Sequence, residues 1–356
     1  MMRRPIGYYV HHQGAGHLAR ARLLAEALDR PCTLLGTFAG AEPGVPSFLD
    51  LPDDRIAEGF DGRDDAKSRP LALHYAPLGV DGLRARMARI AAWVAAADPV
   101  LIVVDVSVEV ALFARLLSVP TLAVRLAGDR TDPPHLEAFR SAERLLAFFP
   151  ERLDSAANPD WVRAKTDYVG FLTADPVDHR TAEDGSIAVV YGRGGTGGDG
   201  AALAAAARAV PDRPWHVLGP VAATSDDRPE NLHLHGWVPD IGPYLDRAAL
   251  VIGAGGDGLV SGVVARAKRF VCLPEPRAFD EQATTARALA ADGAAIHCPA
   301  WPAPEAWPGV VRAGLALDPD CIAALGRAGA VGRATRLIGG LADGLDPHGR
   351  APRRVG

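Results

Sequence analysis

Short apolar runs recur along the first half of the chain, and polar or glycine-rich turns separate them. The first run, residues 6–10, is followed by a polar turn, an amphipathic stretch at 18–28 and a second apolar run at 33–35. Short apolar runs are typical of strands buried on both faces, and the helical spacing of Leu23, Leu24 and Leu28 predicts a helix. A strand, a helix and a strand in this order begin a doubly wound parallel sheet.

The same alternation continues to residue 172 and starts again at residue 186. Further strands are expected at 100–104, 121–124, 145–149, 168–171, 186–191, 215–219, 249–252 and 270–273, and further helices at 83–97, 108–117, 201–209 and 319–341. Residues 172–185 carry mixed charges without an apolar period, which is typical of a linker. Because 356 residues exceed one typical core, we expect domains at 1–172 and 186–318, followed by a helical segment at 319–348.

Two of the expected strands in the second half run directly into glycine-rich turns. Gly192 to Gly198 follows the strand at 186–191, and four glycines between 253 and 258 follow the strand at 249–252. Each turn opens a helix. Glycine lets an anionic group approach the backbone, and a helix start offers free N–H groups and the positive end of its dipole. Both turns are therefore candidate anion-binding sites.

The first turn of the chain formally fits the dinucleotide fingerprint through Gly14, Gly16 and Ala19. That fingerprint expects an acidic residue at the end of the second strand, where it binds the ribose. The strand at 33–35 is followed by no acid before Glu42. We therefore expect no nicotinamide, flavin or other cofactor, although an NAD-dependent oxidoreductase stays an alternative.

Four motifs occur in the order found in one known group of enzymes: Gly14-Ala15-Gly16-His17, Trp237-x-Pro239, Gly255-Gly256 and Glu281-Gln282. In this respect the chain resembles nucleotide-sugar glycosyltransferases with the GT-B fold. It is similar to the family that forms lipid II in peptidoglycan synthesis and to the transferases of natural-product pathways. The resemblance implies an α/β protein with two Rossmann-like domains, whose parallel sheets face each other across a cleft. It also implies that the last helix crosses back to the first domain.

The implied reaction transfers a sugar from a nucleoside diphosphate, most simply UDP, to a hydroxyl or amine, with no metal and inversion at the sugar. The donor would be held mainly by the second domain. The residues assigned to the donor are Gly16, Gly194, Gly195, Thr196, Trp237, Val238, Gly255, Gly256, Asp257, Gly258, Glu281 and Gln282. Trp237 has an indole face that suits stacking on a base, or it is a core residue. Glu281 and Gln282 either bond sugar hydroxyls or cap their helix.

The catalytic residues implied by the resemblance lie in the first domain. His17 is the expected general base, and Asp105, at the end of the strand 100–104, is expected to orient it. The alternatives are a helix-start histidine and a helix N-cap. Arg125, Arg130 and His135 lie in the polar stretch after the strand at 121–124 and are the candidates for acceptor binding, which a solvated loop with internal ion pairs would equally explain. His74 and Tyr75 are weaker acceptor candidates.

The chain departs from the family pattern at two positions. Ala254 stands where a His or another polar residue precedes the glycine pair, and Gly262 stands where a Glu binds the ribose. Losing a charged hydrogen bond costs about 1.5–3 kcal/mol, so donor affinity is expected to be altered. A transferase-like protein that only binds a ligand, and a sugar epimerase, therefore remain alternatives.

Composition excludes several other classes. The net charge of -5 offers no basic field for nucleic acid. The four cysteines have no CxxC spacing, which is typical of reduced thiols in a cytosolic protein, and the Ala, Arg, Gly and Pro bias suggests a GC-rich bacterial genome. No apolar run is long enough to span a membrane, so we expect a cytoplasmic protein whose acceptor is a small molecule or a lipid-linked group met at the membrane surface. The oligomeric state is not predicted.

Overall fold

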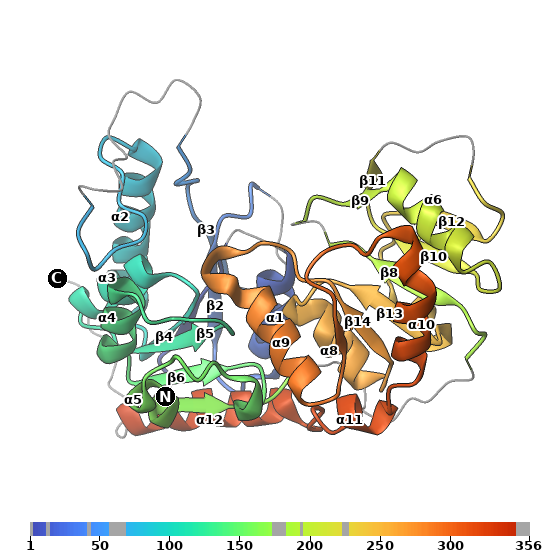
Figure 1. Cartoon of the computed structure of the whole chain (residues 1–356). Coiled ribbons are helices and arrows are strands. Elements are labelled where there is room, and N and C mark those ends of the chain that lie inside the picture. The colour runs from blue at the N-terminus through green and yellow to red at the C-terminus, as the bar shows by residue number, and fades with distance from the viewer. Residues whose placement is uncertain are drawn as a thin grey trace.

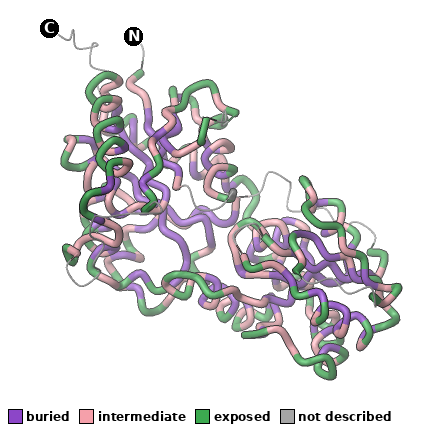
Figure 2. Tube along the Cα trace, turned by 90° about the horizontal axis from the view of Figure 1, so that it is seen from above, coloured by how far each residue is buried: buried purple, intermediate pink, exposed green. Residues whose placement is uncertain are grey.

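The computed structural model describes residues 3–11, 15–40, 44–56, 69–172, 183–192, 195–222 and 228–346. Two lobes, each built on a parallel sheet, lie side by side, with α1, α8 and α9 between the two sheets (Figure 1). In both lobes the strands are buried and the exposed residues lie on the outer helices and loops (Figure 2). Among the described residues, no helix combines the length and apolarity that a membrane span requires.

The N-terminal sheet has seven parallel strands in the order β3-β2-β1-β4-β5-β6-β7. Its strands are β1 (Ile6–Tyr9), β2 (Cys32–Gly36), β3 (Phe48–Asp50), β4 (Leu101–Asp105), β5 (Thr121–Arg125), β6 (Arg144–Ala147) and β7 (Thr166–Tyr168). Its helices are α1 (Ala15–Ala27), α2 (Asp81–Ala97), α3 (Val108–Leu116), α4 (Pro133–Ser141) and α5 (Asp160–Lys165), with a 3-10 turn η1 (Glu151–Leu153). The strand order reverses between β1 and β4. Such a reversal opens a crevice at the carboxyl ends of the two strands.

The C-terminal sheet has six parallel strands in the order β12-β10-β8-β13-β14-β15. Its strands are β8 (Ile187–Val190), β10 (Trp215–Leu218), β12 (Leu232–Gly236), β13 (Leu250–Gly253), β14 (Phe270–Cys272) and β15 (Ile296–His297), and β9 (Gly198–Asp199) pairs separately with β11 (Val221–Ala222). Its helices are α6 (Gly200–Ala209), α7 (Gly242–Arg247), α8 (Asp257–Ala265), α9 (Glu281–Ala291) and α10 (Trp307–Leu315), with 3-10 turns η2 (Ala278–Asp280) and η3 (Pro304–Ala306). The order reverses between β8 and β13, the two strands that precede the glycine turns.

The chain ends in two helices rather than in the single helical run expected at 319–341. They are α11 (Pro319–Ala323) and α12 (Ala330–Leu345). The break lies where Gly326 and Gly329 stand, and Gly329 adopts a positive φ of 76°, which continues no helix. Ala334, Ile338 and Ala342 of α12 belong to the hydrophobic cluster of the N-terminal domain, so the last helix lies along the first lobe (Figure 1).

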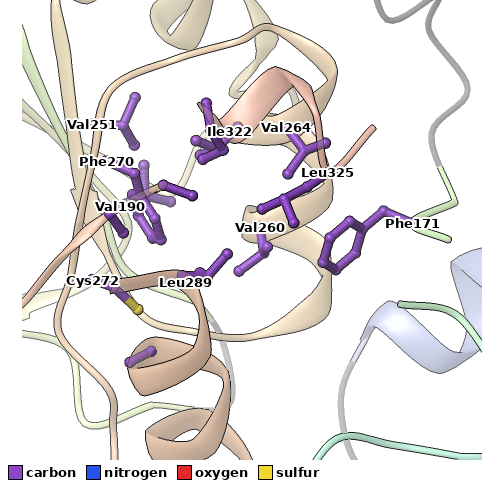
Figure 3. Packing of buried hydrophobic residues seen from close by; sticks show 14 of the residues in the cluster. Phe171, Val190, Val251, Val260, Val264, Phe270, Cys272, Leu289, Ile322 and Leu325 are labelled. Atoms are coloured by element: carbon purple, nitrogen blue, oxygen red, sulfur yellow. The ribbon is translucent and has the colours of Figure 1, made fainter. Parts of the chain in front are cut away.

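A hydrophobic cluster joins the two lobes. It is centred on α8 and β14 of the C-terminal domain and also includes Phe149, Leu153 and Phe171 of the N-terminal domain. Figure 3 shows Phe171 close to Val260 and Leu325. Burial of apolar surface therefore holds the two sheets in one arrangement. The limits given above for the domains stay predictions.

Candidate functional site

The crevice at the strand reversal of the N-terminal sheet contains the expected catalytic pair. His17 lies in the first turn of α1, and Asp105 is the last residue of β4, the strand next to β1. His17 Nδ1 is 3.0 Å from Asp105 Oδ1, and Asp105 is fully buried. The helix start and the strand end therefore bring together two residues that are 88 positions apart in the sequence.

Arg20 completes this group, although it is not among the site residues predicted from the sequence. Its guanidinium donates to both oxygens of Asp105 over 2.8–3.1 Å, and it lies over the ring of Phe148. Burial by itself would raise the pKa of Asp105, but Arg20 and His17 outweigh it and hold that pKa at about 2. Residues three apart on a helix share a face, so the spacing from His17 is the signal that identifies Arg20.

Two charged groups contact the same nitrogen of His17: Asp105 Oδ1 and Arg20 Nη2 both lie 3.0 Å from Nδ1. The carboxylate accepts a hydrogen bond from the imidazole when Nδ1 carries the proton, and in that tautomer Nε2 has the lone pair. Tyr8 also donates to Asp105 Oδ2, over 3.3 Å, so each carboxylate oxygen has two side chains as hydrogen-bond partners. His17 is thus positioned to take a proton through Nε2.

Two cavities meet at His17. One, the α8 cavity, has a volume of about 670 Å³ and lies between the domains, lined by α1 residues including Arg20 and by Trp237, Gly256 and Asp257. The other, the histidine cavity, has a volume of about 920 Å³ and is lined by His11, His74 and His135 among others. Of the residues that the structure describes, His17, Leu126, Arg277 and Glu281 line both cavities.

Most of the expected donor residues line the α8 cavity. They are Gly16, Trp237, Val238, Gly256, Asp257, Gly258, Glu281 and Gln282. Trp237 is 51% exposed, so it is not a core residue. Gly195, Thr196 and Gly255 are not among the described residues that line the cavity, and Gly194 lies outside the described residues. A Cβ on Gly255 would lie 2.8 Å from the carbonyl oxygen of Gln282, so this glycine serves the packing of α9 against the turn.

Glu281 and Gln282 have structural partners in addition to facing the cavity. The side-chain oxygen of Gln282 accepts from the backbone N–H of Glu275 over 2.8 Å. Glu281 accepts from Arg130 of the N-terminal domain over 3.0 Å, and burial together with Asp257 raises its pKa. These contacts involve one oxygen of each side chain, and the role of Glu281 and Gln282 toward a sugar stays a prediction.

The expected acceptor residues separate into two groups. Arg130 and His135 line the histidine cavity, and His74 and Tyr75 do so as well. Arg125 also lines it but is buried, and its guanidinium donates to Asp154 and Tyr168. An ion pair inside the domain therefore accounts for Arg125, and its role toward an acceptor stays a prediction.

A histidine–aspartate cluster forms one wall of the histidine cavity. His74 Nε2 is 2.5 Å from one oxygen of Asp132, and His135 Nδ1 is 2.6 Å from the other. These three residue types could hold a metal, since their ligand atoms lie within 4.8 Å of one another. Arg130, however, places an N–H donor 3.4 Å from Nε2 of His135, which favours the proton on Nδ1 and a hydrogen bond to Asp132. Burial, followed by Arg130, lowers the pKa of His135 to about 4, so this ring is neutral.

Residues 275–281 form the wall between the two cavities and touch the N-terminal domain. The carbonyl oxygen of Phe279 accepts from the backbone N–H of Asp129, and a Cβ on Gly128 would lie 2.6 Å from that oxygen. Phe279 and Asp280 both have positive φ, 59° and 51°, a conformation that costs free energy in residues other than glycine. The contact with the N-terminal domain stabilises this turn in its strained conformation.

Comparisons with known proteins agree with this architecture. No model of a protein family matches the chain, and no curated protein matches it. Solved structures do match, among them the glycosyltransferase of kitacinnamycin, with a TM-score of 0.63 and 16% identity over 96% of this chain and 97% of that chain. MurG of Acinetobacter baumannii matches with a TM-score of 0.65 and 18% identity over 94% and 98% of the two chains. The chain has the GT-B fold.

The GT-B fold confirms the expected fold class of two Rossmann-like domains with parallel sheets. The calicheamicin glycosyltransferase CalG4 matches over 98% of this chain and 97% of its own, with a TM-score of 0.61 and 18% identity. A further match is a spinosyn rhamnosyltransferase solved with thymidine diphosphate, with a TM-score of 0.56 and 18% identity over 96% and 95% of the two chains. At such identities the likeness shows the fold alone, and the activity of this GT-B protein has to be argued from its own residues.

Proposed function

We propose that this GT-B protein is a nucleotide-sugar glycosyltransferase that moves a sugar to a hydroxyl or amine acceptor. The observation that carries the proposal is the position of the His17–Asp105 pair at the junction of two cavities. A transferase needs one space for the donor and one for the acceptor, with a base where they meet. The neighbours in the structure comparison, which are glycosyltransferases, support the same reading.

The proposed reaction needs a base for the acceptor proton. His17 takes that proton through Nε2 as the acceptor oxygen or nitrogen attacks the sugar carbon that bears the diphosphate. Asp105 stays ionised, because its pKa is held at about 2, and it stabilises the imidazolium that forms. Attack from the face opposite the leaving group inverts the configuration of that carbon. Sugar–oxygen bond cleavage releases the nucleoside diphosphate.

The donor is proposed to occupy the α8 cavity. Half-exposed Trp237 offers an indole face for the base, and the backbone N–H groups that open α8 face the diphosphate. Negative charge grows on the leaving diphosphate during the reaction, so fixed donors in a site between two domains stabilise the transition state. UDP is the proposed nucleotide.

Thermal unfolding with a panel of nucleotides tests this proposal. The purified protein is heated with UDP, TDP, GDP, ADP or NAD, each near millimolar. A ligand at about 100 times its dissociation constant stabilises the protein by roughly 2.7 kcal/mol, which raises the unfolding midpoint. A response to one nucleoside diphosphate and none to NAD supports the transferase. A response to NAD alone would favour an oxidoreductase over the transferase. No response to any nucleotide would favour a transferase-like protein that no longer binds a donor.

A further inference from the structure

Each arginine that lines the α8 cavity is paired with a carboxylate that lines the same cavity. Arg20 Nη1 donates to Asp257 Oδ2 over 3.2 Å, across the gap between the domains. Arg277 Nη2 donates to Glu275 Oε2 over 2.6 Å. Within the described part of the lining, these two guanidiniums are the permanent positive charges. The cavity therefore presents its cations already bound to anions of the protein itself.

The two carboxylates also lie at the two glycine turns. Asp257 is the first residue of α8 and directly follows Gly256. Glu275 lies against the turn after β8: a Cβ on Gly195 would come within 2.0 Å of Glu275 Oε1. A side chain at position 195 would therefore displace the Glu275 carboxylate from the backbone of this turn. Both of the candidate anion-binding turns thus have a protein carboxylate beside them.

The charge of the lining makes these positions significant. Among the lining residues that the structure describes, Asp257, Glu275 and Glu281 oppose Arg20 and Arg277, which gives these five side chains a net charge of -1. Behind this lining, Asp105 pairs with Arg20 and Arg130 pairs with Glu281, and the charges of Asp105 and Arg130 cancel each other. A diphosphate entering this lining as it stands would meet repulsion at close range, because Coulomb interactions are strong in a partly buried site.

We propose that Asp257 and Glu275 occupy the place of the diphosphate in the empty protein and hold Arg20 and Arg277 for it. Donor binding exchanges partners: the phosphates take the two guanidiniums, and the two carboxylates turn away toward solvent. This inference rests on the proposed function, whose donor site it describes. It also explains how a chain with Ala254 in place of a polar residue can bind phosphate, since Arg20 supplies the contact from the opposite domain.

The exchange predicts the effect of removing either carboxylate. Asp257→Asn and Glu275→Gln each remove a group that competes with the phosphates for an arginine, so we expect both variants to bind phosphates more tightly. We expect each variant to bind inorganic pyrophosphate roughly five- to tenfold more tightly than the wild type, the size typical of one ion pair in a partly buried site. Arg277→Gln removes a phosphate contact and weakens binding by a similar factor.

Calorimetric titration of the full chain with pyrophosphate, and separately with UDP, tests the inference. Asp246→Asn is the matched control, because Asp246 also accepts from an arginine, Arg266, over 2.8 Å, but does not line the cavity. It changes the net charge by the same amount, and we expect unchanged affinity for both ligands. The side chains of Asp257 and Glu275 are partly exposed, so we expect Asp257→Asn and Glu275→Gln to fold. The unfolding midpoint of each variant checks this.

Pyrophosphate reports on the inference, and UDP reports on the proposed function. Tighter pyrophosphate binding in Asp257→Asn and Glu275→Gln, with Asp246→Asn unchanged, supports the exchange of partners even where UDP does not bind. The exchange of partners is overturned if pyrophosphate affinity is unchanged or lower in both variants, or if no protein of the set binds pyrophosphate. In either case the proposed function stands if UDP still binds. A gain of equal size in Asp246→Asn would also overturn it, because net charge alone would then explain the effect.

Discussion

Replacing Asp105 with asparagine removes the charge that Arg20 and His17 share. The side chain keeps its size and one acceptor oxygen, so the change is electrostatic rather than steric. Arg20 is then a buried cation whose remaining carboxylate partner is Asp257. Removing one partner of a buried ion pair costs about 3–5 kcal/mol, and the contact with Asp257 places this variant near 3 kcal/mol.

The pKa of Asp105 gives a second value for the stability that its charge contributes. It is about 2 in the folded protein, against about 3.9 in an unfolded chain. Because the folded pKa is the lower one, the stabilisation is fully present above about pH 4 and is lost as the pH falls through 2. A pKa difference of about 1.9 corresponds to about 2.6 kcal/mol, which is close to the ion-pair value. The difference between the wild type and Asp105→Asn should therefore narrow between pH 4 and pH 2.

Urea unfolding followed by tryptophan fluorescence measures this difference at pH 7 and at pH 3. Asp154→Asn is the control, because it breaks another buried arginine–aspartate pair of the same domain, with Arg125. We expect both variants to lose stability at pH 7, while only Asp105→Asn shifts the pH at which sugar transfer is half-maximal. Equal stability of Asp105→Asn and the wild type at pH 7 would refute the electrostatic reasoning.

Three further predictions concern separate parts of the molecule. The wild type should lose about 3 kcal/mol of stability between pH 6.5 and pH 4, because the neutral ring of His135 gains a proton only on unfolding, and His135→Asn should not show this loss. The unfolding midpoint measured as a function of pH checks this, and identical curves for the two proteins would contradict it. Gly128→Ala should cost about 1–3 kcal/mol in urea unfolding, because a Cβ would clash with Phe279 at a φ of 104°; an unchanged midpoint would be the contrary result. Trp237→Ala should weaken UDP binding about tenfold in a titration if the indole stacks on the base, and equal affinity would remove Trp237 from the donor site.

The parallel sheets were predictable because they depend on local patterns. Buried parallel strands are apolar along their whole length. Residues 6–10, 100–104 and 249–252 show this pattern, which can be recognised without knowing which strand pairs with which. The GT-B fold, which was expected from the resemblance of the four ordered motifs to one enzyme group, is confirmed by the structure comparison. The break between α11 and α12 was missed, although Gly326 and Gly329 mark it, because the apolar spacing of the two helices was read as one run.

The site was only partly predictable, since it depends on which charged groups meet across the domains. The His17–Asp105 contact follows from the strand ends that the topology brings together. The pairing of Arg20 with Asp257 does not, because no local pattern relates residues 237 positions apart. Arg125 shows the converse: its place in a polar stretch suggested a ligand contact, and its actual partner is the buried Asp154.

The most direct test of the central claim is the turnover of nucleotide sugars by the wild type and by His17→Ala. Nucleoside diphosphate release is measured with the donor that binds and a panel of hydroxyl and amine acceptors. We expect the wild type to release nucleoside diphosphate and transfer the sugar. We expect His17→Ala to bind the donor equally well but to turn over about 10²–10⁴-fold more slowly. Full turnover by His17→Ala would contradict the assignment of the base, and no sugar transfer by the wild type would contradict the proposed function.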